Sequence, residues 1–509
     1  MGNRILVPDP FPIMKRRQIM IYNNPVISGF YPDPSVCEAK GRYFLVTSSF
    51  QYFPGVPLFE SNDLVNWKQI GHVLTRESQL PLTGALSSAG IFAPTIRYYD
   101  GTFYMVTTNT TTGKNFYVTT DNIYGEWSEP IIVEQDGIDP SLYFEDGHAY
   151  FMSNGSDDFG DHGITQCEID ISNGRKLSPS HTIWHGSGGR YLESPHLYKI
   201  GDWYYLTAAE GGTEYGHMIT CARSKFLWEG FEGCPNNPVL TNRNLGGYCI
   251  QGVGHGDLVR KTDTGEWFFL HLGFRQIDRW LTYHHIGRET FLTPVRFDKD
   301  GWLSCGDNGT CREQFEIVGD FVQQRQKSFS FEDRNEWIFL RDPDMRLYQL
   351  TDDKFTLTAN SDDLDGTGSP AFIGIRQKEL CGKLSCTVTV EEGEAGITVY
   401  MDEKHRYDLA IVSASSGCEA ILRLNIGDAK YIRNRLSLSG KTAKLDISMN
   451  NLVYDFSVTD GENTKSFGFA HTRYVSTEVA SGFTGVVFGL YSQGENGKAD
   501  FTDFECSYE

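Results

Sequence analysis

The chain of 509 residues lacks the features that mark secreted, membrane-spanning and zinc-binding proteins. Residues 1–20 contain no apolar stretch of the roughly 7–15 residues that a secretory signal needs. The longest uncharged run, residues 78–96, is rich in Ser, Gly and Pro and therefore predicts no membrane span. The 11 cysteines form no C-x-x-C pair, which argues against a zinc cage, and their odd number leaves at least one thiol free in a monomer. We therefore expect a cytoplasmic protein that has no membrane partner.

Positive charge is also scarce, with 45 Lys and Arg against 66 Asp and Glu and a formal net charge of −21. This balance argues against a nucleic-acid partner, because such proteins use a basic surface to displace counterions. Methionine is rare at 9 residues, whereas aromatic residues reach 13% and glycines number 53, which indicates β-structure with many tight turns. The length exceeds what one hydrophobic core usually supports, so two domains are expected.

One supersecondary unit recurs five times in the first part of the chain. Each copy has a lead residue that is mostly small or polar, then an apolar strand, a glycine turn and an aromatic-rich strand. The lead residues are Asp33, Ala93, Asp139, Ser194 and His255, and the turn glycines are Gly41, Gly101, Gly147, Gly201 and Gly265. Successive lead residues lie 46 to 61 positions apart, which leaves room for two further strands in each unit. Four strands per unit are typical of a β-propeller blade, whereas unrelated hairpins would not keep this register five times.

The remainder of the chain lacks this repeat. Short predicted strands, at residues 380–390, 395–401, 421–426 and 445–450, alternate with Gly, Asp and Asn turns, and residues 352–368 are predicted as a loop. These features are typical of an antiparallel β-sandwich. The predicted fold is therefore all-β, with an N-terminal extension over 1–21, a five-bladed β-propeller over 22–318 and a β-sandwich over 319–509.

Three carboxylates are predicted to meet at the propeller axis. The first strand of each blade lines the central channel, so the lead residues should converge on one face. Asp33 and Asp139 are lead residues, and Glu193 directly precedes the lead residue Ser194. Carboxylates crowded in a partly desolvated site separate in pKa, so one can hold a proton while another stays ionised, as hydrolysis of a glycosidic bond requires. An Asp-Pro pair on its own would equally well begin a strand, but its recurrence at one repeat position favours a site.

Several segments then carry a family resemblance. They are Asn-Pro-Val-Ile-Ser-Gly-Phe-Tyr-Pro-Asp-Pro-Ser-Val at 24–36, Ser-Ser-Phe-Gln-Tyr-Phe-Pro-Gly-Val-Pro at 48–57, Asp-Leu-Val-Asn-Trp at 63–67, Glu-Gly-Gly-Thr at 210–213, Gly-His-Gly-Asp at 254–257 and Gly-Arg-Glu-Thr at 287–290. Further matches occur at 337–343, 375–377 and 482–485. The sequence resembles glycoside hydrolase family 43, the β-xylosidase and α-L-arabinofuranosidase group, over nearly all of the chain after residue 22.

The resemblance implies a role for each candidate residue. Asp33 matches the general base that activates water, Glu193 the general acid that protonates the leaving oxygen, and Asp139 the carboxylate that tunes the pKa of the acid. The implied substrate-binding residues are the aromatic walls Phe50 and Phe92, Thr213, Arg288 near the bound sugar, and Phe483 in a sandwich loop that closes one side of the funnel. Related enzymes invert the anomeric centre of the sugar. The resemblance also implies that the sandwich is of the concanavalin-like kind.

His255 has three interpretations. In related propellers a histidine at this position contacts either the sugar or a hydrated calcium ion, and the third interpretation is a neutral imidazole satisfied by the backbone. A single histidine without a carboxylate cage is a weak indication of a hard, oxygen-seeking cation. We therefore predict that His255 binds substrate and that no cofactor is required, with a structural calcium held through water left open.

The sequence thus predicts a cytoplasmic, exo-acting, inverting glycoside hydrolase in xylan degradation. Its expected substrates are xylo- or arabinoxylo-oligosaccharides, from which it removes terminal β-D-xylose or α-L-arabinofuranose. One alternative is an endo-arabinanase, which needs an open cleft, and another is a non-catalytic carbohydrate-binding propeller. The preference between the two pentoses and the presence of a homo-oligomer stay open at this point.

Overall fold

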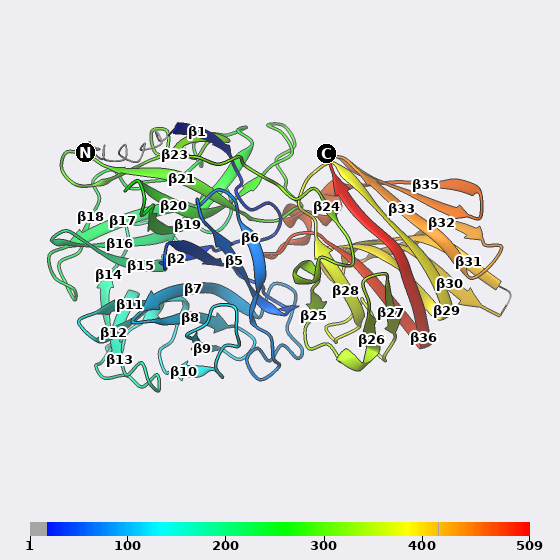
Figure 1. The fold of residues 1–509 in the computed structure, drawn as a ribbon, viewed down its shortest axis with the longest axis horizontal. Helices are drawn as coiled ribbons and strands as arrows, with labels where there is room; N and C mark the ends of the chain where they lie inside the picture. The colour runs from blue at the N-terminus through cyan, green and yellow to red at the C-terminus, as the bar shows by residue number, and fades with distance from the viewer. Residues whose placement is uncertain (1–17, 416) are drawn as a thin grey trace, which may run out of the picture.

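β-Strands dominate this computed structural model, which describes residues 18–415 and 417–509, and they form two bodies (Figure 1). A five-bladed propeller is followed by a β-sandwich, so the predicted all-β fold is confirmed. Helical residues in the described ranges are confined to α1 (Thr477–Ala480), η1 (Arg334–Glu336), η2 (Met345–Leu347) and η3 (Thr472–Val475). None of these helices has the length or apolar character needed to cross a lipid bilayer. All 11 cysteines lie in the described ranges and are free.

Each blade is a four-stranded antiparallel sheet whose strands follow chain order. The strands are, in blade one, β2 (Ser35–Ala39), β3 (Arg42–Val46), β5 (Gly55–Ser61) and β6 (Lys68–Leu74); in blade two, β7 (Ile91–Tyr99), β8 (Thr102–Asn109), β9 (Lys114–Thr120) and β10 (Ile131–Val133); in blade three, β11 (Ile138–Glu145), β12 (His148–Ser156), β13 (His162–Ile169) and β14 (His181–Trp184); in blade four, β15 (Glu193–Ile200), β16 (Trp203–Glu210), β17 (Met218–Ser224) and β18 (Glu232–Gly233); and in blade five, β19 (Ile250–Arg260), β20 (Trp267–Arg275), β21 (Glu289–Phe297) and β22 (Leu303–Cys305). The first strands β2, β7, β11, β15 and β19 contact one another around the ring.

A two-stranded sheet outside the blades joins the two ends of the propeller segment. β1 (Gln18–Asn23) pairs antiparallel with β23 (Gln314–Gly319). Of the predicted N-terminal extension over 1–21, residues 1–17 lie outside the described residues, and residues 18–21 belong to β1. The predicted propeller limits of 22 and 318 therefore fall inside two paired strands, whose partnership across almost 300 residues leaves no local signal in the sequence.

The sandwich consists of one connected network of 12 antiparallel strands. They are β24 (Ser328–Phe329), β26 (Tyr348–Leu350), β27 (Lys354–Thr358), β28 (Ala371–Arg376), β29 (Gly382–Tyr400), β30 (His405–Ala414), β31 (Gly417–Ile426), β32 (Ala429–Ser437), β33 (Thr442–Met449), β34 (Val453–Asp460), β35 (Asn463–His471) and β36 (Val487–Tyr508). The long strands β29 and β36 pair with each other along most of their lengths. Each of them also pairs with further strands, so this pair connects the network.

Two local predictions for the sandwich were wrong. The predicted separate strands at 380–390 and 395–401 form the single strand β29, because register shifts near 390–394 absorb the polar Glu-Glu-Gly-Glu segment without ending its pairing with β36. The predicted loop at 352–368 contains β27, which pairs with β36 and buries Phe355 and Leu357. Both errors arise because pairing with a distant strand outweighed a local turn-like composition.

The sandwich is joined to the propeller beside the channel. β4 (Tyr52–Phe53), in the propeller segment, pairs with β25 (Phe339–Leu340) from the second body. The buried Arg341 guanidinium donates to the Ala85 carbonyl at 2.6 Å and forms an ion pair with Glu403. These contacts hold the sandwich loops against one end of the propeller.

A buried ion pair crosses the propeller channel. Arg97 Nη1 in β7 lies 2.7 Å from Asp257 Oδ2 in β19, and the Asp257 side chain is only 1% exposed. The same carboxylate accepts from Ser35 Oγ in β2 and from Tyr198 Oη in β15, each at 2.6 Å. Burial alone would raise the pKa of Asp257, but the charge of Arg97 and the hydrogen bonds from Arg97 and Ser35 hold it well below its usual value. One carboxylate therefore ties together four of the five blades.

We predict that Asp257→Ala lowers the free energy of unfolding by about 3–5 kcal/mol, because it leaves the Arg97 charge buried without its partner. Urea denaturation followed by tryptophan fluorescence measures this change. Asp428→Ala, which removes an exposed partner of Lys404, is the matched control and should leave the free energy nearly unchanged. Equal effects of the two substitutions would contradict a central role for the ion pair.

Candidate active site

A cavity of about 340 Å³ lies where the blades converge. All nine predicted site residues line it: Asp33, Phe50, Phe92, Asp139, Glu193, Thr213, His255, Arg288 and Phe483. Ligand cavities usually measure about 300–1,000 Å³, so this one is at the small end of the range. It suits one sugar ring better than the middle of a polymer.

An unusual backbone conformation aims the key side chains into this cavity. The lead residues Asp33, Asp139, Ser194 and His255 have φ values of 56°, 54°, 57° and 46°, in the left-handed region that non-glycine residues rarely adopt. The inner strands β11, β15 and β19 also change register at these positions. A bulge redirects a side chain, and strained backbone of this kind costs roughly 1–3 kcal/mol per residue and gathers at functional sites. The repeat therefore delivers the same distortion from four blades to one point.

Asp33 is held in its ionised form. Ser48 Oγ donates to Asp33 Oδ2 at 2.6 Å, and Arg288 Nη1 donates to Asp33 Oδ1 at 3.1 Å. Burial alone would raise the pKa of Asp33, but the Arg288 charge and the Ser48 hydrogen bond outweigh it and lower the pKa. At neutral pH this carboxylate is available to accept a proton.

Asp139 and Glu193 behave in the opposite way. Burial and the charge of Glu193 raise the pKa of Asp139 well above its usual value. Burial and the charge of Asp33 raise the pKa of Glu193 to about 7, and Glu214 adds to this effect. Near neutral pH the site therefore combines one ionised carboxylate with a carboxylic acid, which is the pairing needed for general acid–base chemistry.

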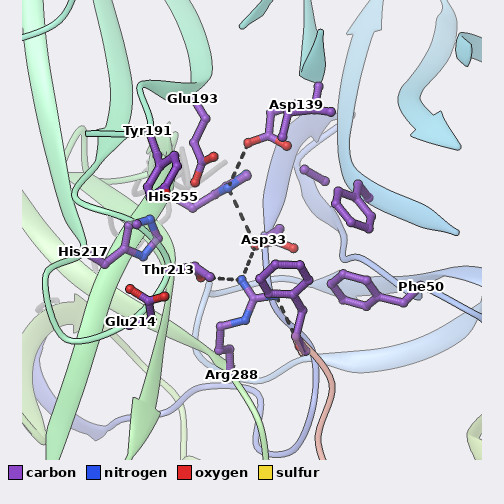
Figure 2. A pocket seen from close by; sticks show the side chains of 15 residues that line it. Asp33, Phe50, Asp139, Tyr191, Glu193, Thr213, Glu214, His217, His255 and Arg288 are labelled. Atoms are coloured by element: carbon purple, nitrogen blue, oxygen red, sulfur yellow. Dashed lines mark hydrogen bonds and ion pairs between the residues drawn. The ribbon is translucent and has the colours of Figure 1, made fainter. Parts of the chain in front are cut away.

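His255 lies between two of the carboxylates (Figure 2). Its Nδ1 is 3.7 Å from Asp33 Oδ1 and 3.8 Å from Asp139 Oδ2. Burial lowers the pKa of His255, so its ring is neutral at neutral pH and presents a polar edge between the acids. Of its three interpretations, a position inside the cavity agrees with direct contact to a ligand.

The surroundings of His255 bear on the calcium ion that the sequence left open. No group of three or more His, Cys, Asp or Glu side chains among residues 18–415 and 417–509 is arranged to hold a metal ion. The neighbouring ring of His196, 6.5 Å from that of His255 between centroids, accepts a hydrogen bond at Nδ1 from Arg97 Nη2 at 2.8 Å. The Arg97 guanidinium therefore supplies the positive charge next to His196, and we assign no step to a metal.

Aromatic rings form one wall of the cavity. Phe50 stacks on Phe483 with ring centroids 6.1 Å apart, and Phe92 meets both rings edge-on. Phe483 belongs to the sandwich, and its backbone N donates to Ser88 Oγ at 2.8 Å while its carbonyl accepts from Arg288 Nη2 at 3.3 Å. The second body therefore closes one side of the cavity, in the place that the family resemblance implied.

Arg288 connects the catalytic candidates to the wall. Besides Asp33 and the Phe483 carbonyl, its Nη1 donates to Thr213 Oγ1 at 2.7 Å. Its guanidinium carbon is 5.8 Å from the centre of the Phe50 ring and 5.5 Å from that of Phe483. One buried cation thus positions a carboxylate, a hydroxyl and two aromatic rings.

Sequence reasoning missed other residues of the cavity, notably Tyr191, Glu214 and His217 (Figure 2). Tyr191 lies two residues before Glu193, and Glu214 follows Thr213, so their proximity to predicted residues was an available signal. His217 stands in the turn between β16 and β17, outside the repeated motif, and nothing in the sequence pattern distinguished it.

Comparison with known proteins agrees with this geometry. A family model described as Glycosyl hydrolases family 43 matches residues 22–303, and one described as Beta xylosidase C-terminal Concanavalin A-like domain matches residues 324–507. The non-reducing end alpha-L-arabinofuranosidase BoGH43B of Bacteroides ovatus is 38% identical over 511 residues, with 95% of each chain covered. A xylosidase/arabinosidase of Butyrivibrio fibrisolvens is 36% identical over 523 residues, with 96% of this chain and 98% of the relative covered.

Solved structures extend the similarity to the whole fold. A protein described as Bacteroides ovatus Xyloglucan PUL GH43B has a TM-score of 0.90 at 36% identity, covering 96% of this chain and 100% of that chain. The xylan beta-1,4-xylosidase of Bacillus halodurans has a TM-score of 0.88 at 28% identity, with the same coverage. Propeller and sandwich therefore occur together in these relatives.

Proposed function

Because the chain belongs to glycosyl hydrolase family 43, we propose that it is an exo-acting enzyme that releases terminal β-D-xylose or α-L-arabinofuranose. Its substrates are xylo- or arabinoxylo-oligosaccharides, and it hydrolyses them with inversion. One observation carries the proposal: an ionised Asp33 and a Glu193 with a pKa of about 7 share one small cavity. The names of the two relatives, an arabinofuranosidase and a xylosidase/arabinosidase, support the choice of pentose substrates.

The mechanism assigns one proton transfer to each of two carboxylates. The Asp33 carboxylate takes a proton from water as that water attacks the anomeric carbon, and Glu193 gives its proton to the glycosidic oxygen as the carbon–oxygen bond breaks. The products are a sugar of inverted anomeric configuration and a shortened oligosaccharide with a new hydroxyl group. Arg288 keeps Asp33 ionised, and burial together with the negative charge of Asp33 keeps Glu193 protonated up to a pH of about 7.

The shape of the cavity favours removal of a chain end. Phe50, Phe92 and Phe483 close one side, and the volume of about 340 Å³ leaves little room for sugars on both sides of the bond. An endo-arabinanase would need an open cleft through which the polymer passes. The enclosed end of the cavity therefore favours an exo-acting enzyme over an endo-acting one.

We expect the wild-type protein to hydrolyse a nitrophenyl β-D-xyloside or α-L-arabinofuranoside, and the ratio of kcat/KM on the two measures its sugar preference. On oligosaccharides, proton NMR should show monosaccharide release and the inverted anomer before mutarotation.

Asp33→Asn and Glu193→Gln should each lower kcat on an oligosaccharide by roughly 10²–10⁴-fold, because each substitution removes one proton transfer. Oligosaccharide binding without turnover by wild type would instead identify a non-catalytic propeller, and release of longer products would identify an endo-acting enzyme.

We predict that kcat/KM on a disaccharide falls as the pH rises through about 7. Glu193 must be protonated, and its raised pKa of about 7 keeps it so up to that pH. On the acid side, activity should persist until the pH falls below the usual range of an aspartate, because the pKa of Asp33 is lowered. A pH–rate profile measures both limbs, and an alkaline limb that begins near the ordinary pKa of a glutamate would contradict the assignment of Glu193.

In this proposal turnover needs no divalent cation, because the Arg97 guanidinium already supplies a positive charge beside His196, whose ring centre is 6.5 Å from that of His255. Dialysis against EDTA should therefore leave kcat/KM on a nitrophenyl glycoside unchanged. A loss of activity that added calcium restores would contradict this prediction.

A further inference from the structure

An ion pair holds two loops together beside the cavity: the loop between β14 and β15, and the loop between β16 and β17. Arg190, in the loop before β15, forms an ion pair with Glu214, in the turn after β16, at 2.7 Å. The backbone N of Gly211 donates to the Arg190 carbonyl at 2.7 Å. Gly212 has a φ of +80°, and a Cβ there would lie 3.2 Å from atoms of Arg190, Tyr191 and Glu214. The positive φ favours glycine at this position, and the short distances show how closely the two loops approach.

The ring of Tyr191 lies against Arg190, one partner of this ion pair. The guanidinium carbon of Arg190 is 5.1 Å from the ring centre, so the cation supports the ring. Tyr191 lines the cavity, yet the residue is 63% exposed and has a φ of 54°. None of the buried apolar clusters found in the described ranges includes it. A large ring in a strained conformation without a packing role is therefore available to a ligand.

The position of Tyr191 indicates which part of the substrate it meets. Glu193 protonates the leaving oxygen, so the leaving sugar departs on the Glu193 side of the cavity. Tyr191 lies beside Glu193, two residues earlier in the chain, and across the cavity from Phe50 (Figure 2). The wall built from Phe50, Phe92 and Phe483 encloses the other side, where the terminal sugar fits. The exposed ring therefore adjoins the leaving group.

We propose that Tyr191 is the stacking platform for the sugar ring on the leaving-group side of the cleaved bond. The inference rests on the proposed function and adds to it the residue that recognises the second sugar unit, a pyranose with an apolar C–H face. Arg190 is a positioning residue, because it supports the ring and holds Glu214 in place. The Glu214 charge also raises the pKa of Glu193, so the Arg190–Glu214 ion pair links the leaving-group side of the cavity to the acid.

The test compares a substrate that has a leaving sugar with one that has none. Xylobiose or an arabinofuranosyl-xylose is paired with the corresponding glycosyl fluoride, whose leaving fluoride needs no platform. For Tyr191→Ala, we expect kcat/KM on the disaccharide to fall about tenfold further than kcat/KM on the fluoride, the size expected for a lost aromatic contact. Tyr191→Phe keeps the ring and should retain most of the wild-type ratio.

Phe226→Ala is the matched control, because Phe226 is 64% exposed and is not among the residues that line the cavity. This substitution should leave the ratio of the two kcat/KM values at its wild-type level. An equal fall on both substrates, or no fall on the disaccharide, with Tyr191→Ala would overturn the platform while the proposed function stands. A wild-type protein that hydrolyses neither compound would overturn the proposed function, and the platform with it.

Discussion

The ion pair between Arg97 and Asp257 fixes the spacing of the blades, and the geometry of the cavity depends on it. Asp257 accepts hydrogen bonds from blades one and four as well as from Arg97 of blade two. Ser35 lies two residues after Asp33, and Asp257 lies two residues after His255. The hydrogen bonds of Ser35 and Asp257 therefore also position Asp33 and His255, which lie two residues away and line the cavity.

In the cavity, the position of one cation, Arg288, separates the pKa values of the three carboxylates. Arg288 contacts Asp33 at 3.1 Å, and Ser48 donates to the same carboxylate, so Asp33 ionises most readily. Asp139 and Glu193 are buried near that negative charge, and their pKa values rise as a result. Burial alone would have raised all three pKa values. The contrast between base and acid thus comes from where the guanidinium and the Ser48 hydroxyl lie, not from the residue types.

The sandwich contributes to the site as well as to the stability of the chain. Phe483 supplies part of the cavity wall, and its backbone is held by Ser88 and Arg288 from two loops of the propeller. Behind that wall, Arg376 of the sandwich lies over the ring of Phe30, and Phe30 stacks on Phe50. The propeller by itself would leave this side of the cavity open, so the enclosed end that favours an exo mode of action is a property of both bodies together.

The sequence alone determined the five-fold repeat, the sandwich that follows it and the convergence of Asp33, Asp139 and Glu193. These depend on local hydrophobic patterns, turn glycines and a repeated lead position, all of which are legible within a few residues. Only the tertiary structure decided how the pKa of each carboxylate shifts, that β1 pairs with β23 and that β29 is one strand. Each of these outcomes depends on contacts between segments distant in the chain or on the depth of burial, and neither quantity is encoded in a local pattern.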